Sequence, residues 1–380
     1  MKVKLSEVFE LQIGKTPSRN NISYWNGNNK WISIADLSNA NKYIYETKEC
    51  ITEAAVSDIG IKLVPKETIV MSFKLSIGKV AITQEDMYTN EAIMAFIDKG
   101  IFDIDINYIY YLFLGMDWLV GTNKAVMGLT LNKSVLSEKK IVLPDIKKQH
   151  EIVDKLTCLD FIITNKKKQL AKLDEIIKSR FIEMFGNINI NDRDWDALPL
   201  GDLCTIVRGG SPRPIVDYLG GTIPWIKIGD ATEGDDIYLR STKEFIISEG
   251  IKKSRMVKAG SLIFANCGVS LGFARIITFD GCIHDGWLAM EDIDGRLNKI
   301  FLLQSLNQMT GNFRKMAPAG TQPNLNTTIM KAYMQILPPI KLQEEFISFI
   351  EKVNKSELAV KASLEKLETL KKSLMQQYFG

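Results

Sequence analysis

Two stretches of the chain carry the hydrophobic pattern of a coiled coil. Apolar residues in the first recur at alternating steps of four and three: Ile152, Leu156, Leu159, Ile163, Leu170, Leu173, Ile177 and Met184. The second stretch repeats the pattern with Phe346, Ile350, Val353, Val360, Leu364, Leu367, Leu374 and Tyr378. Polar residues interrupt the two seams at Lys166, Arg180, Glu357 and Lys371. A 3.5-residue period is typical of helices that pack along a shared seam.

Proline and glycine mark the ends of both stretches. Pro144 precedes the first stretch and Gly186 follows it. Pro338–Pro339 and Gly380 flank the second in the same way. Proline is tolerated in the first turn of a helix, and glycine is common just after the last turn. The sequence therefore predicts one long helix in each stretch. About 35 helical residues at 1.5 Å each make a rod of roughly 50 Å.

A helix that packs only on its own domain is the simpler alternative. We favour pairing between the two helices because their seams match in length and phase. Each helix follows a globular domain, so an antiparallel pair would place the two domains at opposite ends of a rod. The two copies would then be related by an approximate two-fold axis.

The chain is one unit written twice. "LSEVFELQIGKTP" (5–17) aligns with "LGDLCTIVRGGSP" (200–212), and "WISIAD" (31–36) aligns with "WIKIGD" (225–230). "LPDIKKQ" (143–149) and "LPPIKLQ" (337–343) match at nearly the same offset. Anchors that keep one offset along nearly the whole chain indicate a tandem duplication.

Each copy begins with a mixed region. Short β-rich runs such as "ETIVMSF" and "GSLIFAN" are separated by Gly, Pro, Asn and Asp, which is typical of a compact α+β domain. The predicted fold class is therefore α+β, in which a mixed α/β domain followed by a long helix occurs twice. The predicted parts are domain 1 (1–143), the central helix (144–186), domain 2 (187–337) and the C-terminal helix (338–380).

Composition narrows the class of protein. Apolar residues make up 46% of the chain and charged residues 24%, as in soluble globular proteins. No apolar run approaches the roughly 18 residues of a membrane span, and the first ten residues lack a signal-peptide pattern, so we expect a cytoplasmic protein without a membrane partner. Five scattered cysteines without a C-x-x-C pair favour reduced thiols and no zinc site. The net charge is only +3, so binding to a polyanion must rest on local faces or on a partner.

Two divergent domains at the ends of a rod suggest a bivalent reader. Dimeric DNA readers contact sites about one helical turn apart, and divergent copies would read two different half-sites. A bivalent reader of another ligand stays open on this argument alone.

Several segments resemble a known family. "LPDIKKQHEIVDKL" and "LPPIKLQEEFISFIEKV" resemble the proline-led starts of the central and distal helices in specificity subunits of Type I restriction–modification enzymes. "GGSPRPIVDYLGGTIPWIKIGDAT" (209–232) resembles the opening of a target-recognition domain of that family, and "AGTQPNLN" (319–326) resembles a segment near its end. The first half carries weaker versions, "GKTPSRNNISYWNGNNKWISIADL" and "VMGLTLNKSVL". The resemblance spans essentially the whole chain.

The resemblance implies a division of labour. Two target-recognition domains would each read a few base pairs of double-stranded DNA, and the helices would set an unread spacer. The helices would also dock two methyltransferase subunits, and restriction–translocation subunits would join for cleavage. The chain itself would be non-catalytic and would need no cofactor.

"QIGKTPSR" (12–19) raises the alternative of a nucleotide-binding loop. Such a loop needs a glycine five residues before Gly14, where Phe9 stands, and the second copy has no lysine equivalent to Lys15. The shared residues therefore predict a turn. Residues on it that reach phosphates or bases are candidate DNA contacts: Lys15, Thr16, Arg19, Arg208, Ser211 and Arg213. A plain solvated turn is the alternative.

Amide and basic side chains elsewhere complete the candidate DNA contacts. Asn and Gln pair with adenine and Arg with guanine. The candidates are Lys79, Thr130, Asn132, Lys227, Arg275, Gln322, Asn324 and Asn326. Asn132 and Asn326 recur in both copies, which favours a structural or phosphate-binding role. Lys166, Lys167 and Lys168 are either a solvated helix face or contacts to the backbone of the spacer DNA.

Catalytic alternatives lack their motifs. "LPPI" (337–340) lacks the polar residue and the aromatic ring of an amino-methyltransferase site, and no glycine-rich cofactor loop follows a strand. His150 and His284 are the only histidines, and a structural role is favoured for both. A stand-alone restriction or modification enzyme and a DNA-free scaffold are the competing hypotheses.

Overall fold

The computed structural model describes residues 1–74, 76–119, 131–232, 237–268, 270–317 and 324–380. Contacts within the chain divide it into two compact units. Unit 1 comprises Met1–Lys167 and Ala362–Gly380, and unit 2 comprises Lys168–Lys361. Both units therefore contain a globular part and a segment of each long helix, so the four-part division predicted above stays a prediction.

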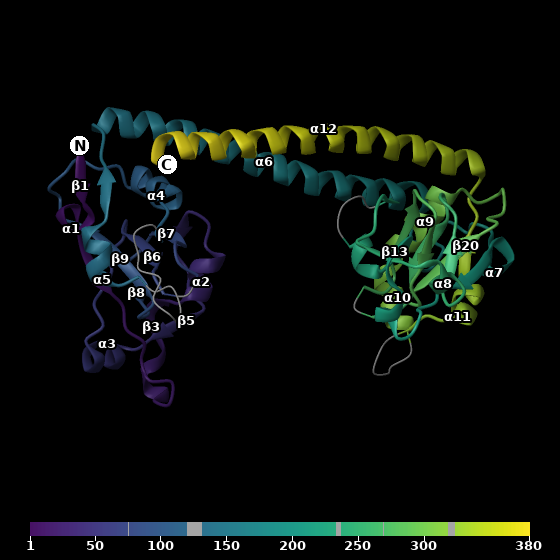
Figure 1. Cartoon of the computed structure of the whole chain (residues 1–380), viewed down its shortest axis with the longest axis horizontal. Coiled ribbons are helices and arrows are strands. Elements are labelled where there is room, and N and C mark those ends of the chain that lie inside the picture. The colour runs from purple at the N-terminus through teal and green to yellow at the C-terminus, as the bar shows by residue number, and fades with distance from the viewer. Residues whose placement is uncertain (75, 120–130, 233–236, 269, 318–323) are drawn as a thin grey trace. The chain divides into compact units, whose positions relative to one another are not determined.

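Unit 1 contains three sheets (Figure 1). A five-stranded sheet has the order β2-β9-β6-β7-β4, a second has the order β5-β3-β8, and β1 pairs with β10. The strands are β1 (Lys2–Lys4), β2 (Phe9–Ile13), β3 (Trp25–Ile32), β4 (Tyr43–Ile44), β5 (Glu49–Ile51), β6 (Ile69–Ser72), β7 (Val80–Thr83), β8 (Tyr88–Thr89), β9 (Ile93–Asp98) and β10 (Lys140–Val142). The helices are α1 (Leu5–Val8), η1 (Ile22–Tyr24), α2 (Ile34–Asn39), α3 (Glu53–Ile59), α4 (Ile106–Gly115), α5 (Lys133–Glu138) and α6 (Ile146–Phe185), which continues into unit 2.

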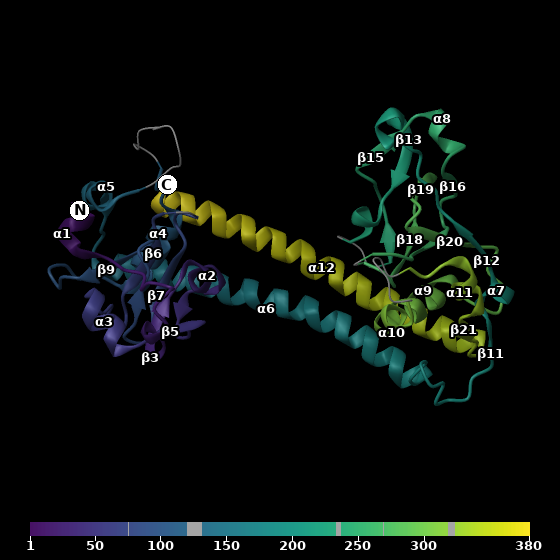
Figure 2. The same cartoon turned by 90° about the horizontal axis from the view of Figure 1, so that it is seen from below.

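Unit 2 repeats this topology with one strand added at the edge of its second sheet (Figure 2). Its sheets have the orders β12-β20-β17-β18-β14, β15-β13-β19-β16 and β11-β21. The strands are β11 (Ala197–Pro199), β12 (Thr205–Arg208), β13 (Leu219–Ile226), β14 (Tyr238–Leu239), β15 (Glu244–Ile246), β16 (Arg255–Val257), β17 (Leu262–Ala265), β18 (Ala274–Ile277), β19 (Gly281–Ile283), β20 (Trp287–Glu291) and β21 (Met334–Ile336). The helices are α7 (Leu200–Leu203), η2 (Ile215–Tyr218), η3 (Ile228–Ala231), α8 (Ser248–Ile251), α9 (Lys299–Gln308), α10 (Thr310–Met316), α11 (Thr327–Ala332) and α12 (Ile340–Phe379), which continues into unit 1. The tandem duplication and the α+β class are confirmed.

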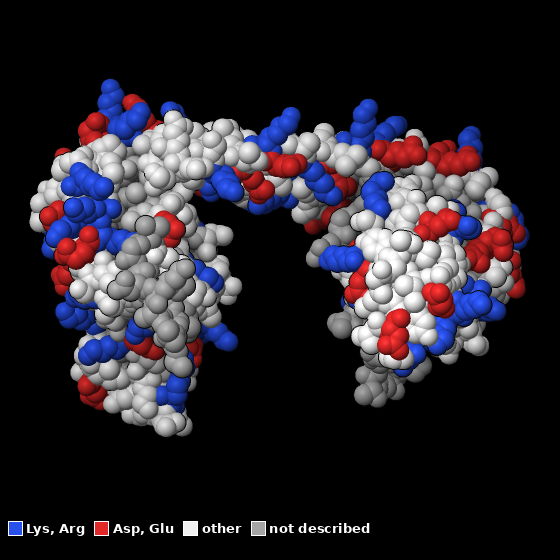
Figure 3. Space-filling model, in the orientation of Figure 1, with Lys and Arg blue, Asp and Glu red and all other residues white. Residues whose placement is uncertain are grey.

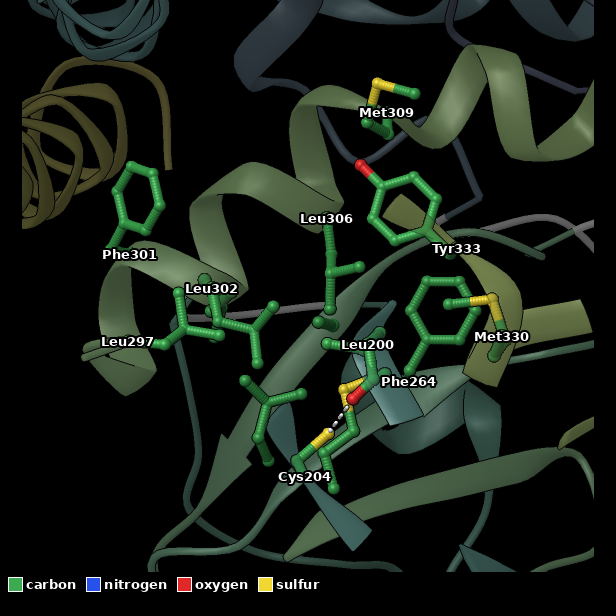
Figure 4. Packing of buried hydrophobic residues seen from close by; sticks show 14 of the residues in the cluster. Leu200, Cys204, Phe264, Leu297, Phe301, Leu302, Leu306, Met309, Met330 and Tyr333 are labelled. Atoms are coloured by element: carbon green, nitrogen blue, oxygen red, sulfur yellow. Dashed lines mark hydrogen bonds between the residues drawn. The ribbon is translucent and has the colours of Figure 1, made fainter. Parts of the chain in front are cut away.

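The core of each unit lies between its five-stranded sheet and the long helices. In unit 2, Leu302 and Leu306 of α9 belong to one buried cluster with Phe264 of β17 (Figure 4). Phe301 of α9 lies farther along the cluster, where its ring contacts Phe181 and Phe185 of α6. Met330 and Tyr333, at and just after α11, close the same cluster. In unit 1, α4 takes the place of α9 and packs between the sheet and the long helices (Figure 1).

The long helices run antiparallel within each unit. In unit 1, Lys167 of α6 pairs with Glu368 of α12 at 2.7 Å, and Asp160 pairs with Lys371. In unit 2, the rings of Phe181 and Phe346 lie 5.4 Å apart. Higher numbers on α6 thus meet lower numbers on α12, which is the antiparallel pairing considered above. The polar seam residue Lys371 has a carboxylate partner.

A buried glutamine anchors each long helix to its globular part. Gln149 donates to the carbonyls of Asp103 and Pro144 at 3.0 Å each and accepts from the amide of Asp105 at 2.9 Å. Its counterpart Gln343 makes the same three bonds, to Arg296, Pro338 and Asn298, at 2.9, 2.8 and 2.8 Å. Both side chains are fully buried. The glutamine of "LPDIKKQ" and "LPPIKLQ" therefore sets the position of the helix start.

Candidate nucleic-acid interface

The Gly-x-Ser/Thr-Pro turn predicted from the repeat has the same backbone path in both units. Gly14 packs so tightly that a Cβ there would lie 2.0 Å from the carbonyl oxygen of Thr89. A Cβ on Gly209 would lie 2.2 Å from the carbonyl oxygen of His284. Only glycine fits such a close approach of two backbones. The repeated glycine therefore positions the turn.

The hydroxyl of this turn binds a carboxylate in both units. Thr16 donates to Glu91 in unit 1. Ser211 donates to Asp285 in unit 2, at 2.7 Å. Glu91 and Asp285 stand 194 residues apart in the sequence, at equivalent positions before β9 and β20. The turn residues recur because this hydroxyl–carboxylate bond holds the loop.

Lys15 is exposed and caps a helix. Its ammonium donates to the carbonyl oxygen of Ile59, the last residue of α3, at 2.7 Å. A cation is favourable at this end of a helix because the unpaired carbonyls carry partial negative charge. One of three N–H donors is used. Lys15 stays a candidate phosphate contact.

Arg19 is held in place by a tryptophan ring and a carboxylate. Its guanidinium lies 3.9 Å from the centre of the Trp25 ring and makes two bonds to the carboxylate of Glu49. The hydrogen bond from Arg19 is the main cause that lowers the pKa of Glu49. The Arg19 side chain is still 56% exposed. A stacked, carboxylate-bound guanidinium with free edges suits contact with guanine or phosphate.

In unit 2 the turn cations gather around Asp285. Arg208 donates to its backbone carbonyl at 3.2 Å, and Arg213 approaches its carboxylate at 3.4 Å. Burial alone would raise the pKa of Asp285. The hydrogen bond from Ser211 and the nearby positive charges together lower this pKa by more, so the net shift is downward. Arg213 is 81% exposed. The carboxylate thus holds the base of a loop whose arginines face solvent.

His284 has a structural role in this cluster. Its Nδ1 accepts the amide of Gly286 at 2.8 Å, and its Nε2 lies 3.0 Å from the Asp285 carboxylate. In unit 1 the equivalent Asn90 accepts the amide of Ala92 at 3.0 Å. Burial lowers the pKa of His284, more than Asp285 raises it. A neutral ring matches its acceptor role.

Lys227 precedes η3 and faces a repeated carboxylate. Its ammonium binds Glu244 and lies 5.8 Å from the centre of the Trp225 ring. Glu244 lies across from Trp225 in the β13–β15 ladder, as Glu49 lies across from Trp31 in the β3–β5 ladder. The two units thus use equivalent carboxylates to hold cations from different positions.

Lys79 and Arg275 do not join the exposed loop residues. Arg275 is only 8% exposed, and its guanidinium lies 4.9 Å from the centre of the Phe273 ring. It lines a cavity of about 630 Å³ that also includes Arg240. Lys79 is half-buried and donates to Ser38 at 2.6 Å. Their contact with DNA stays a prediction.

The candidate amides are partly used by the fold. Asn132 caps α5 by accepting from Val135 at 2.9 Å, and Asn326 caps α11 through Ile329 at the same distance. These bonds explain why both residues recur. Asn324 accepts from the buried Asn266 at 3.2 Å. Thr130 and Gln322 lie outside the described residues.

The lysine run lies on α6. Lys167 is exposed and paired with Glu368, Lys166 is half-buried, and Lys168 is exposed. On the face drawn in Figure 3, Lys and Arg alternate with Asp and Glu over both units. The charge pattern there matches the balanced composition, so a backbone contact by this run stays a prediction.

Glu49, Glu91 and their counterparts Glu244 and Asp285 are the site residues that sequence reasoning missed. The repeat offset could have identified them, because each carboxylate recurs in the alignment of the two copies. Within the described ranges no cluster of three His, Cys, Asp or Glu side chains could hold a metal ion. None of the described helices combines the length and the apolar character that a membrane span requires.

Known proteins are similar to this chain in sequence. The chain is 28% identical over 377 residues to the Type I restriction enzyme MjaIX specificity subunit of Methanocaldococcus jannaschii, covering 92% of this chain and 85% of that protein. It is 28% identical over 185 residues to the EcoR124I/EcoR124II specificity subunit of Escherichia coli, covering 47% and 45%.

Solved structures share the fold. A chain from a structure concerning complex assembly and conformational transition of the type I R-M system has a TM-score of 0.69 at 16% identity, covering all of this chain and 97% of the other. The S subunit from M. genitalium has a TM-score of 0.52 at 14% identity, covering 100% and 96%. The Type I restriction modification DNA specificity domain matches residues 1–175 and 192–369. The chain therefore belongs to the Type I restriction–modification specificity family, whose members are non-catalytic DNA-recognition components.

Proposed function

We propose that this chain reads an asymmetric, two-part DNA sequence, with one part for each unit. The observation that carries the proposal is the shared loop scaffold that bears different cations. Arg19 is held in unit 1, whereas Arg213 and Lys227 are held in unit 2. Different side chains on equivalent loops would contact different bases. A target with two unlike halves follows.

The proposal gives the long helices two tasks. They would set the length of the unread spacer between the halves, and they would dock two methyltransferase subunits and the restriction–translocation subunits. The chain would supply sequence recognition, and catalysis and cofactors would belong to those partners. Its work would take place in the cytoplasm, where the DNA is.

A direct test combines binding with methylation. Gel shifts would compare the chain with and without its methyltransferase subunit, and methylome sequencing would follow in cells that express both. Methylation confined to one two-part motif is the expected result. Methylation that persists after deletion of the chain would refute recognition by this chain and favour a catalytic partner with its own specificity. Absence of DNA binding in every combination would favour a scaffold for another ligand.

Two rearrangements test the modular account. Exchange of residues 1–143 for the equivalent part of another family member should change one half of the motif and leave the other intact. Insertion of one heptad into each long helix should lengthen the spacer without changing either half. A change in both halves after the exchange would show that recognition is not divided between the units.

A further inference from the structure

A bulge interrupts the β3–β5 ladder of unit 1. Trp25 and Asn29 both lie opposite Ile51, so residues 26–28 have no partner on β5. A bulge of this kind redirects side chains away from the sheet. The ladder lies at the end of unit 1 farthest from α6 and α12 (Figure 1).

Unit 2 has the same bulge at the equivalent place. Leu219 and Ile223 both lie opposite Ile246 of β15, so residues 220–222 have no partner. Each number is larger by 194 or 195 than its counterpart in unit 1. The ladder lies at the end of unit 2 away from α12 (Figure 2). The bulge is therefore part of the duplicated scaffold.

A glycine pins the centre of each bulge. A Cβ on Gly27 would lie 2.3 Å from the carbonyl oxygen of Ile51, and a Cβ on Gly221 would lie 2.1 Å from that of Ile246. Neither position accepts a side chain, because the obstacle is backbone. The residue at the centre of the bulge must therefore be glycine, whereas this packing places no such requirement on the two flanking residues.

The flanking residues differ between the units. In unit 1 they are Asn26 and Asn28, both exposed. Their counterparts are Gly220 and Thr222. Asn26 has a φ of 61°, which asparagine tolerates better than most residues, and Gly220 has a φ of 86°. Among described residues, neither amide of unit 1 has a hydrogen-bond partner. The scaffold is kept while the presented side chains change.

We propose that Asn26 and Asn28 recognise adenine in the half-site read by unit 1. An asparagine side chain pairs with adenine through two hydrogen bonds: its amide nitrogen donates to N7, and its amide oxygen accepts from the N6 amino group. A two-stranded ribbon fits the major groove, where these atoms are exposed. Trp25, next to the bulge, carries the stacked Arg19 guanidinium. Unit 2 presents no amide at its bulge, so its half-site is not read in this way. The inference rests on the proposed function.

The test transplants the bulge of unit 2 onto unit 1. The full chain, assembled with its methyltransferase subunit, would select from a randomised duplex library, and the bound DNA would be sequenced. The double variant Asn26→Gly with Asn28→Thr should lose preference for adenine at one or two positions of one half-site, by roughly ten- to a hundred-fold. The other half-site should be unchanged.

A matched control uses Asn29, whose amide already donates to Glu53 at 3.0 Å. Asn29→Thr should leave the adenine preference intact. If the double variant keeps the wild-type motif, the assignment of these two residues is wrong. If the wild-type complex selects no motif, the proposed function itself fails. Circular dichroism melting would confirm that the variants are folded, and the unchanged second half-site would report the same within the selection.

Discussion

In unit 1 the carboxylate of Glu49 holds Arg19, whereas in unit 2 its counterpart Glu244 holds Lys227. The two carboxylates lie across from equivalent tryptophans in equivalent ladders. The cations come from different places: Arg19 from the loop before β3, and Lys227 from the residue after β13. The carboxylate therefore has the same position in both copies, whereas the basic side chain that it binds comes from a different position. A fixed carboxylate can orient any nearby basic side chain, so contacts to DNA can change without rebuilding the sheet.

The two units also differ in the hydrogen bonds of two equivalent tryptophans, Trp31 and Trp225. Trp31 donates to the backbone carbonyl of Lys15 at 3.1 Å. In unit 2 the hydroxyl of Ser254 donates to the equivalent carbonyl, of Gly210, at 2.8 Å. The indole N–H of Trp225 is buried without a partner in the described part of the chain. The turn is held in both units, by different donors.

The largest expected difference between the units concerns two equivalent phenylalanines. Phe185 is fully buried among Phe181, Phe301 and Phe346, whereas Phe379 is half-buried and contacts Tyr108. Phe185→Ala should destabilise unit 2 by about 3–5 kcal/mol, because it leaves a cavity in a packed core. Phe379→Ala should cost unit 1 roughly half as much. Denaturant unfolding with hydrogen exchange would assign each loss to its unit.

The control for this pair is Phe161→Ala, since Phe161 is 67% exposed. It should change the free energy of unfolding by less than about 0.5 kcal/mol. Equal losses of unfolding free energy for Phe185→Ala and Phe379→Ala would contradict this prediction. They would show that the two phenylalanines stabilise their units equally despite their different burial.

Replacement of either buried glutamine should reduce stability by the same amount, which tests whether the two helix starts are energetically equivalent. Gln149→Ala and Gln343→Ala each remove two hydrogen bonds to backbone carbonyls and one from a backbone amide. Each variant should lose about 3 kcal/mol. Hydrogen exchange should rise near α4 for the first and near α9 for the second. Lys147→Ala, an exposed neighbour on α6, should have little effect. A loss below 1 kcal/mol would mean that water replaces the side chain at little cost.

Replacement of each turn carboxylate should affect recognition of one half-site only. Asp285→Asn removes the carboxylate charge that Ser211 and Arg213 contact, so recognition by unit 2 should relax by about tenfold. Non-specific affinity should rise and depend more steeply on salt, because one anion near the phosphates is gone. Glu91→Gln should produce the same change in the other half-site. The measurement is binding to half-site variants over a salt series, and an effect on both half-sites from one substitution would contradict separate reading.

Much of the fold could be predicted from periodicity and repetition. The seams predicted both helices, and Pro144 and Gly186 lie within two residues of the observed ends of α6. The division into compact units could not be predicted, because it depends on which segment of each helix packs on which domain. Residues 362–380 follow the second domain in sequence and pack in unit 1. A seam pattern contains no such information.

The site was harder to predict, because the sequence shows which side chains are basic or carry amides but not which groups of the fold they contact. Arg275 has the right chemistry for a base contact, but it is buried and lines a cavity beside α9. Asn132 and Asn326 have the right amides, but their oxygens cap helices. No sequence motif identifies the bulge residues Asn26 and Asn28, since only the register of β3 on β5 shows that they have no partner on β5. Long-range register is not encoded in any short motif.

The smallest expected difference is a response to pH. Burial lowers the pKa of His284, so folded unit 2 binds a proton at this site less readily than the unfolded chain does. Its contribution to stability is therefore present above the ordinary histidine pKa and is lost as the pH falls below it. Unit 1 has Asn90 at this position and should show no such loss from this site. Hydrogen exchange of both units at pH 7.5 and 5.5 would measure the difference.

The variant His284→Asn sharpens this test because it places the residue of unit 1 in unit 2. The amide oxygen of asparagine can accept from Gly286 as Asn90 accepts from Ala92. The variant should fold, and the acid-dependent loss in the loop before β20 should disappear. His150→Asn is the control, since His150 is exposed at the start of α6 and lies in the other unit. If the loss persists in His284→Asn, protonation elsewhere in unit 2 is responsible. If it disappears, one residue accounts for a difference in acid stability between two copies of the same fold.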